Sequence, residues 1–129
     1  MASREIADCH PDLQRIIPMF LHACHVEKID ILLYCTYRSA KEQDDLYAIG
    51  RTKPGKIVTN CKGGQSKHNF TLNGKPASKA FDFVPLIGGR PQWNNKALYL
   101  RAGEIAEKFG LEWAGRWTGK LKETAHCQI

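Results

Sequence analysis

Two stretches of the chain place apolar residues at the spacing of an amphipathic helix. Between positions 11 and 25, apolar side chains recur every three or four residues: Leu13, Ile16, Ile17, Phe20, Leu21 and Cys24. A second run follows Asn94 or Asn95, either of which can cap a helix, and ends at Phe109, just before Gly110. The pattern predicts two helices that each bury one apolar face. Pro18 lies inside the first helix and, because it lacks an amide proton, should kink or split it.

Short apolar runs predict strands at residues 29–36, 80–84, 111–114 and 125–129. Side chains alternate along a strand, so Phe81 and Phe83 share one face of 80–84 and Asp82 occupies the other. A carboxylate on a half-buried strand needs a partner, and a metal ion, an arginine or backbone amides can each serve. Asp82 is therefore a candidate site residue.

A further helix is predicted directly after the first strand. Ser39 and Glu42 have the spacing of a capping box, and Gly50 ends the helix that they begin. Arg38 precedes the cap, at a strand-to-helix junction where side chains often project into sites. The alternative is a surface arginine paired with one of the two aspartates in that helix, and the sequence leaves both interpretations open.

The composition is that of one globular domain. The chain has 129 residues, of which 43% are hydrophobic and 25% charged, so we expect a single domain over residues 1–129 with a core of its own. No apolar run approaches the ~20 residues of a membrane helix. The first residues lack a basic head followed by an apolar stretch, so we expect no secretory signal and synthesis in the cytoplasm.

Cysteines and charge narrow the classes of site and partner. Five cysteines occur without a Cys-x-x-Cys pair, so we expect free thiols rather than a zinc ribbon or a redox motif. The net charge of +6 favours an anionic partner, which can be nucleic acid, a membrane surface or a polyanionic wall polymer. Nucleic acid is the weakest of these, because the basic residues are scattered and match no nucleic-acid-binding module.

Two segments far apart along the chain carry residues suited to a metal site. The first contains Ser66, His68 and Asp82, and the second contains Glu123 and His126. Two imidazoles and one carboxylate are ligands that catalytic zinc sites use, with a fourth position left open. Glu123 is then a second carboxylate able to move protons. A tight turn over residues 122–125 would let Glu123 and His126 face one site.

The separation of His68 and Asp82 is the difficulty in this scheme. Asn73-Gly74 is a strong two-residue turn signal, and a hairpin closed there sets His68 opposite Lys79. Asp82 then lies roughly 10 Å further along the strand, at ~3.3 Å per residue, which is too far for one shared metal ion. A bulge or a bend would have to close this gap.

Several short motifs occur in a characteristic order along the chain. They are His10-Pro11-Asp12-Leu13-Gln14, Tyr37-Arg38-Ser39 with Gln43, Ser66-x-His68, Ala80-Phe81-Asp82, Trp113-Ala-Gly-x-Trp117 and Glu123-x-x-His126. In this order they resemble the M15 family of peptidases, in particular phage endolysins and bacterial L-alanyl-D-glutamate peptidases, with the D-alanyl-D-alanine peptidases as relatives. The resemblance extends over most of the chain. It implies an α+β fold, a small single domain with a central antiparallel sheet flanked by helices, as in Hedgehog and D-Ala-D-Ala peptidase domains.

The resemblance implies a zinc-dependent peptidase that hydrolyses stem peptides of peptidoglycan, at the L-Ala–D-Glu bond. It implies that Zn²⁺ is bound by three side chains: His68, Asp82 and His126. It further implies that Glu123 is the general base and that Arg38 contacts the substrate or the oxyanion. Ser66 is expected to form local hydrogen bonds or to orient the substrate, because no adjacent base would activate it as a nucleophile.

The chain departs from the family pattern in two places. The family usually reads His-x-x-Gly-x-Ala-x-Asp, which is half the interval of fourteen residues from His68 to Asp82 in this chain. We interpret the extra residues as a loop inserted between the two ligands. Relatives commonly have Trp-Gly-Gly-Asp-Trp where this chain reads Trp-Ala-Gly-Arg-Trp, so Arg116 replaces an acid, a change that bears on substrate preference.

Two other functions stay open at this point. One is a D-Ala–D-Ala carboxypeptidase or dipeptidase of the same family. The other is a wall-binding module that kept the fold without turnover, although a binding module has no need of a general base such as Glu123. A phage-type lysis enzyme would be made in the host cytoplasm, act on the cell wall as a monomer, bind no nucleic acid and need a holin-like partner for release.

Overall fold

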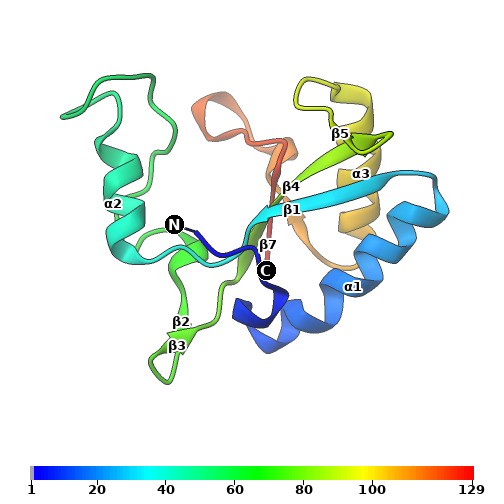
Figure 1. Cartoon of the computed structure of the whole chain (residues 1–129), viewed down its shortest axis with the longest axis horizontal. Coiled ribbons are helices and arrows are strands. Elements are labelled where there is room, and N and C mark those ends of the chain that lie inside the picture. The colour runs from blue at the N-terminus through cyan, green and yellow to red at the C-terminus, as the bar shows by residue number, and fades with distance from the viewer. Residues whose placement is uncertain (1) are drawn as a thin grey trace.

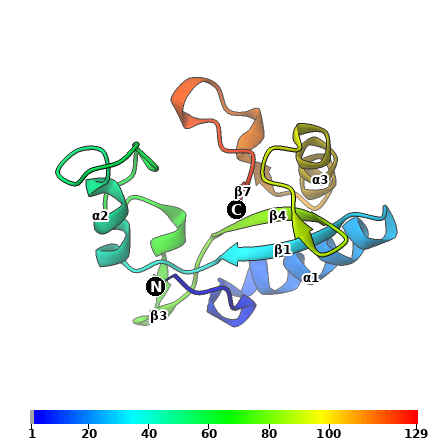
Figure 2. The same cartoon turned by 45° about the horizontal axis from the view of Figure 1, so that its top comes forward.

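The computed structural model describes residues 2–129, so the expected domain of residues 1–129 begins at Met1, outside the described range. The helices are α1 (Pro11–Val26), α2 (Ala40–Ala48) and α3 (Lys96–Lys108). The strands are β1 (Asp30–Cys35), β2 (Thr71–Leu72), β3 (Lys75–Pro76), β4 (Ala80–Ile87), β5 (Arg90–Pro91), β6 (Glu112–Trp113) and β7 (His126–Gln128). Figure 1 shows β1 and β4 crossing the middle of the molecule, with α1 and α3 to one side and α2 and the β2–β3 hairpin to the other. The turned view in Figure 2 shows the same division, with α2 on one side and α1 and α3 on the other.

One antiparallel sheet organises the chain. Its strand order is β1-β4-β7-β6, and β5 pairs with the far part of β4, while β2 and β3 form a separate hairpin. The last strand of the described chain, β7, thus lies inside the sheet, between β4 and β6. The predicted α+β architecture, with a central antiparallel sheet flanked by helices, is confirmed.

The core lies between one face of β4 and the helices α1 and α3. Phe81 and Phe83 contact Phe20 of α1, with ring centroids 5.6 and 5.7 Å apart, and Phe83 also contacts Tyr99 of α3 at 5.6 Å. Because side chains alternate along a strand, the same packing directs Asp82 to the opposite face. Burial of this aromatic cluster therefore orients the candidate ligand.

The helix signals in the sequence correspond to real caps. Ser39 and Glu42 form the predicted capping box at the start of α2, and the side chain of Asn95 caps α3. We expected Pro18 to kink or split the first helix; the split is wrong, because α1 is continuous over Pro11–Val26. Pro18 lies on the exposed side of α1, where water can satisfy the carbonyl that loses its helical partner. Over residues 2–129, no helix combines the length and the apolar character needed to cross a bilayer.

Trp113 connects α3 to the segment that leads into β7. A Cβ atom at Gly103 of α3 would lie only 2.2 Å from the ring of Trp113, and one at Gly115 would lie 2.1 Å from it. The indole therefore occupies space that two glycines leave open. Its Nε1 atom donates a hydrogen bond of 2.8 Å to the carbonyl of Thr124, which fixes the chain just before His126.

Candidate metal centre and catalytic cleft

A cleft beside β4 brings the predicted site residues together. It encloses about 770 Å³ and is lined by parts of β1 and β4 and by the segments around residues 58–68 and 122–128. All the residues singled out from the sequence line it: Arg38, Ser66, His68, Asp82, Glu123 and His126. Strand pairing thus joins the middle of the chain to its last strand at one site.

Asp82 lies between two imidazole rings. Its Oδ1 atom is 3.2 Å from Nε2 of His68 and 3.1 Å from Nδ1 of His126. His126 is the register partner of Asp82 in the pairing of β7 with β4, so the sheet sets the separation of these two residues. The two imidazoles contact each other nearly edge to face, with centroids 5.1 Å apart.

The gap of roughly 10 Å expected between His68 and Asp82 is wrong. The predicted hairpin is present as β2–β3, but Lys67–Asn69 forms a 3₁₀ turn instead of an extended strand. The Oγ atom of Ser66 accepts a hydrogen bond of 3.2 Å from the amide of His68, and the carbonyl of His68 accepts one of 3.0 Å from the amide of Arg38. The turn is therefore held against the β1–α2 connection, and the ring of His68 reaches Asp82.

Hydrogen bonds behind each ring determine which nitrogen presents a lone pair to Asp82. Nδ1 of His68 lies 2.7 Å from the backbone carbonyl of Thr36. A carbonyl can only accept, so neutral His68 carries its proton on Nδ1 and directs the lone pair of Nε2 at Asp82. Nε2 of His126 lies 2.9 Å from the side-chain oxygen of Gln128. By the same reasoning, neutral His126 directs the lone pair of Nδ1 at Asp82.

This arrangement fits a divalent cation. Two imidazole lone pairs directed at one carboxylate oxygen repel it unless a positive charge lies among them. Burial alone would lower the pKa of His68, but the carboxylate of Asp82 raises it to about 10. Burial alone would raise the pKa of Asp82, but the charge of His68 and hydrogen bonds from both rings hold it well below its usual range. The proton of His68 supplies a positive charge in metal-free protein, and a divalent cation that favours nitrogen and oxygen ligands, such as zinc, would take its place.

Cys35 is a further potential ligand that the sequence analysis did not single out. Its Sγ atom, one atom of His68 and one of Asp82 lie within 4.8 Å of one another, among the residues that the structure describes. A register shift between Leu33 and Cys35 sets Cys35 opposite Asp82 in the β1–β4 pair. The thiol, however, lies 3.7 Å from Nδ1 of His68, the nitrogen already bonded to a carbonyl. The two histidines and the aspartate therefore account better for the lone-pair directions.

Arg38 points into the cleft. Its Nη2 atom lies 3.8 Å from Oδ2 of Asp82 and donates to Sγ of Cys35 at 3.3 Å. Its Nη1 atom donates a hydrogen bond of 2.8 Å to the side-chain oxygen of Gln43. Gln43 is fully buried and in turn donates to the carbonyl of Cys61 at 2.9 Å. The guanidinium is thus held in one orientation from both sides.

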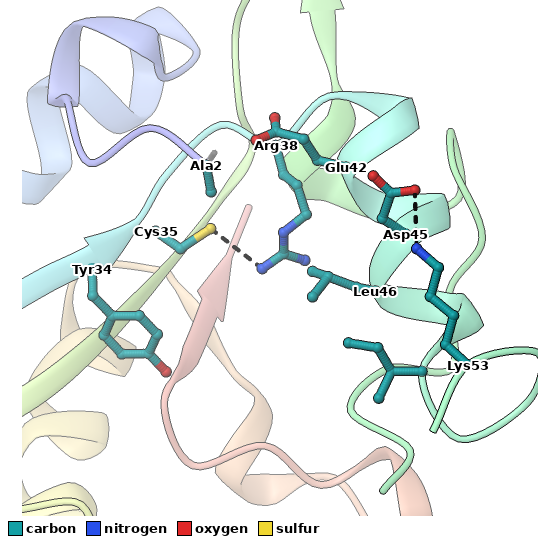
Figure 3. Close-up of a pocket in the computed structure, with 9 residues that line it drawn as sticks. Ala2, Tyr34, Cys35, Arg38, Glu42, Asp45, Leu46 and Lys53 are labelled. Atoms are coloured by element: carbon teal, nitrogen blue, oxygen red, sulfur yellow. Dashed lines mark hydrogen bonds and ion pairs between the residues drawn. The ribbon is translucent and has the colours of Figure 1, made fainter. Parts of the chain in front are cut away.

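The interpretation of Arg38 as a surface arginine paired with Asp44 or Asp45 is wrong. Asp44 accepts a hydrogen bond of 2.7 Å from the amide of Gly63, and Asp45 lies 3.9 Å from Nζ of Lys53. A second pocket of about 480 Å³ lies on the side of α2. Figure 3 shows Arg38 among the residues that line it. Arg38 lines both this pocket and the metal-site cleft, as do Tyr34 and Leu46, so these three side chains form the boundary between them.

Glu123 lies at the edge of the ligand cluster. Its Oε2 atom is 3.7 Å from Nδ1 of His126, and its side chain is 46% exposed. The amide of His126 donates to the carbonyl of Glu123 at 3.2 Å, which is the tight turn that the sequence predicted. The amide of Glu123 donates to the carbonyl of Ala114 at 3.2 Å and anchors the turn. A carboxylate that is open to water and adjacent to the ligands can accept a proton from a water molecule there.

Ser66 has a clear local role at the start of the 3₁₀ turn. Beyond its bond to the amide of His68, its own amide donates to the side-chain oxygen of Asn69 at 3.2 Å. Asn69 then donates to the carbonyl of Arg38 at 2.8 Å. Ser66 therefore helps to position both His68 and Arg38, and contact with a substrate stays a prediction.

Arg116, the departure from the family motif, lies outside the residues that line the cleft. Its guanidinium pairs with Glu107 of α3 at 3.0 Å. The neighbouring Trp117 does line the cleft, with its ring 5.6 Å from that of His126, and its Nε1 atom donates to Glu112 at 2.8 Å. Of the two motif residues, Trp117 is the one that contacts the ligand cluster.

Three contributors to the site escaped the sequence analysis. Thr36 acts through its backbone carbonyl, which leaves no side-chain signal. Cys35 reaches the site because of a strand irregularity that alternation does not indicate. Gln128 lies two residues after His126, hence on the same face of β7, and this spacing was a usable signal.

Comparisons with known proteins find enzymes of similar sequence and of similar fold. No model of a known protein family matches the chain. The chain is 36% identical to the peptidoglycan L-alanyl-D-glutamate endopeptidase CwlK of Bacillus subtilis (strain 168), in an alignment that covers 95% of this chain and 74% of that protein. Its structure is similar to that of the Serratia marcescens L-Ala D-Glu endopeptidase ChiX, with a TM-score of 0.70 over 100% of this chain and 88% of that one. At 20% sequence identity, the second likeness concerns the fold.

Proposed function

This chain belongs to the M15 family of peptidases, and from that premise we propose that it is a zinc-dependent endopeptidase that cleaves the L-Ala–D-Glu bond in stem peptides of peptidoglycan. The observation that carries the proposal is the convergence of two imidazole nitrogens on Oδ1 of Asp82, with the carboxylate of Glu123 adjacent. The relative of 36% identity, an enzyme named for this bond, supports the choice of substrate.

In this proposal the metal is held by Nε2 of His68, a carboxylate oxygen of Asp82 and Nδ1 of His126. Zinc, when bound there, supplies a Lewis acid that lowers the pKa of water from about 15.7 towards 7. The protein's own contribution is to orient the two imidazole ligands through the hydrogen bonds behind them, at Thr36 for His68 and at Gln128 for His126. Cys35 is adjacent but is not needed as a ligand.

Glu123 is proposed as the general base. Its carboxylate accepts the proton of the attacking water as the water's oxygen bonds to the peptide carbonyl carbon, and then transfers that proton to the leaving amine. The exposed position of Glu123 at the cleft edge allows it to reach water and substrate. The turn that links it to His126 fixes its distance from the ligands.

Arg38 is proposed to stabilise the negative charge that develops on the carbonyl oxygen. Its guanidinium is nearly buried beside Asp82 and is oriented beforehand by Gln43, so little reorganisation is needed during the reaction. Lys67 and Lys122 also line the cleft, and their charges suit a stem peptide that carries free carboxylates. Ser66, at the cleft wall, is proposed to orient the peptide.

We extend the proposal to the biological setting that the family resemblance favours. The protein would act as a monomeric, phage-type endolysin, made in the host cytoplasm and released to the cell wall through a holin-like partner. Co-expression tests this part: lysis of the host should need both the protein and a holin. Lysis by the protein without such a partner would contradict it.

The experiment that tests the activity is mass spectrometry of purified Gram-negative peptidoglycan after incubation with the protein, with and without a zinc chelator. The expected result is new L-alanine and D-glutamate termini that disappear when the chelator is present. Loss of terminal D-alanine instead would replace the proposal with a carboxypeptidase. Unchanged peptides with zinc-loaded protein would replace it with a wall-binding module, and Glu123→Gln protein serves as the inactive control.

A further inference from the structure

A chain of hydrogen bonds leads away from His126 on the side opposite Asp82. Nε2 of His126 lies 2.9 Å from the side-chain oxygen of Gln128. The amide nitrogen of Gln128 donates a bond of 2.8 Å to Oε1 of Glu112, and Oε2 of Glu112 accepts one of 2.8 Å from Nε1 of Trp117. Glu112 and Gln128 are register partners in the β6–β7 pair, so the sheet places them side by side.

The direction of every bond in this chain is determined by chemistry. An indole nitrogen can only donate and a carboxylate can only accept, so the bond from Trp117 to Glu112 has one possible direction. The other oxygen of Glu112 also accepts, so the amide nitrogen of Gln128 must face it. The carbonyl oxygen of Gln128 must then face His126, and that oxygen only accepts. His126 is therefore required to carry a proton on Nε2, whichever way the amide is drawn.

We propose that Glu112 and Gln128 are positioning residues that keep the proton of His126 on Nε2 and so keep Nδ1 free to bind the metal ion. The proposal rests on the proposed function for the presence of zinc, and on the hydrogen bonds alone for the state of the ring. Neither residue is proposed to bind the metal ion itself. Gln128 acts through the ring of His126, and Glu112 acts through Gln128. A hydrogen bond behind a ligating imidazole also raises its basicity and fixes the ring plane.

Glu112→Gln should reverse the direction of the hydrogen bonds that link position 112, Gln128 and His126, and not merely weaken them. Trp117 still donates, so the new amide presents its oxygen to Trp117 and its nitrogen to Gln128. Gln128 must then turn its oxygen towards position 112 and its nitrogen towards His126. A donor facing Nε2 favours a proton on Nδ1, the atom that the metal requires. Glutamine has nearly the size of glutamate, so the substitution changes the direction of these hydrogen bonds without changing the packing.

The exchange variant, Glu112→Gln combined with Gln128→Glu, should restore the original direction. The amide at position 112 accepts from Trp117 and donates to the carboxylate at position 128, and that carboxylate accepts from Nε2 of His126. Charge and composition equal those of the unchanged protein. Glu107→Gln is the matched control, because it removes the same charge from a nearby residue that pairs with Arg116 instead.

The test measures zinc affinity by competition with a chromophoric chelator, and the Nε2–H proton resonance of His126 by NMR in metal-free and zinc-loaded protein. Thermal melting checks that each variant is folded. Glu112→Gln should raise the zinc Kd by about 10- to 100-fold and remove the protected Nε2–H resonance. The exchange variant should recover both properties, and Glu107→Gln should change neither.

Three outcomes would overturn the inference. The first is a Glu112→Gln protein with the same zinc Kd and the same resonance as the Glu107→Gln control. The second is a folded exchange variant that stays as impaired as Glu112→Gln. The third is an unchanged protein without a protected Nε2–H resonance. Failure of the unchanged protein to bind zinc would refute the proposed function instead. The Nε2–H resonance of metal-free protein would then still test the positioning role. Its loss in Glu112→Gln and its return in the exchange variant would support that role.

Discussion

The guanidinium of Arg38 lies 3.8 Å from the carboxylate of Asp82, and each side chain is only 14% exposed. Arg38 follows β1 and Asp82 belongs to β4, so the antiparallel pairing of these strands brings the two together. Gln43 holds the other side of the guanidinium. The cation is therefore fixed next to a candidate metal ligand, where it can act on charge that develops in a reaction.

Arg38→Lys should lower kcat by roughly 10²-fold, because an ammonium group keeps the charge but loses the planar fork that Gln43 and the site orient. Zinc affinity should change little, since Arg38 is not a ligand. Steady-state hydrolysis of a defined muropeptide measures the first effect, and chelator competition measures the second. Arg51→Lys is the control, because Arg51 is exposed and stacks on Tyr47 at 3.7 Å. An Arg38→Lys protein with the kcat of that control would contradict the assignment.

Glu123→Gln should reduce hydrolysis by about 10²- to 10⁴-fold while leaving zinc bound, because the amide cannot accept the proton of the attacking water. The substitution keeps the size of the side chain and the turn that precedes His126. Zinc content and kcat are measured on the same preparation. Glu104→Gln, at an exposed position of α3, should leave both unchanged. Loss of zinc together with activity would indicate that Glu123 supports the metal rather than the proton transfer.

Metal-free protein should lose stability as the pH rises from about 6.5 to about 10. Asp82 raises the pKa of His68 from 6.5 to about 10 in the folded protein. A raised pKa stabilises the folded state fully below the unfolded value, and this stabilisation is lost as the pH passes through the folded value. Urea unfolding in the presence of a chelator, at several pH values, measures the loss. Asp82→Asn should make the free energy of unfolding depend less on pH over this range. Equal pH profiles for the two proteins would contradict the ion pair.

Gly103→Ala should destabilise the protein by about 1–3 kcal/mol, the usual cost of overpacking a core. The added methyl group would meet the ring of Trp113, which is fixed by its bond to Thr124. Urea unfolding measures the change in free energy. Glu104→Ala in the same helix tests the general effect of alanine and should not destabilise. A Gly103→Ala protein as stable as that control would show that Trp113 can move aside.

Much of the fold follows from local patterns. The apolar stripes of α1 and α3, the capping box at Ser39 and the alternation that turns Asp82 away from Phe81 all depend on neighbours in sequence. The order of the motifs likewise pointed to the residues that the cleft brings together. These features can be predicted from the sequence because the periodicities of helices and strands repeat within a few residues.

The remaining features depend on contacts between distant segments. The 3₁₀ turn that carries His68 to Asp82 is held by the backbone of Arg38, and a hairpin signal alone suggested an extended path. The register shift before Cys35 arises in the pairing of β1 with β4. The partnership of Glu112 with Gln128 exists only once β6 and β7 are paired. Local sequence patterns do not specify such pairings, so these parts were out of reach.

The position of β7 inside the sheet has a consequence for how the protein folds. β7 lies far along the chain from β4, yet it fills the position between β4 and β6 and carries His126, the buried Cys127 and Gln128. Until it inserts, β4 and β6 have no common neighbour, and the ligand set and the core both lack a member. Completion of the sheet and assembly of the proposed ligand set are therefore one event in folding, and a protein truncated before β7 would have neither.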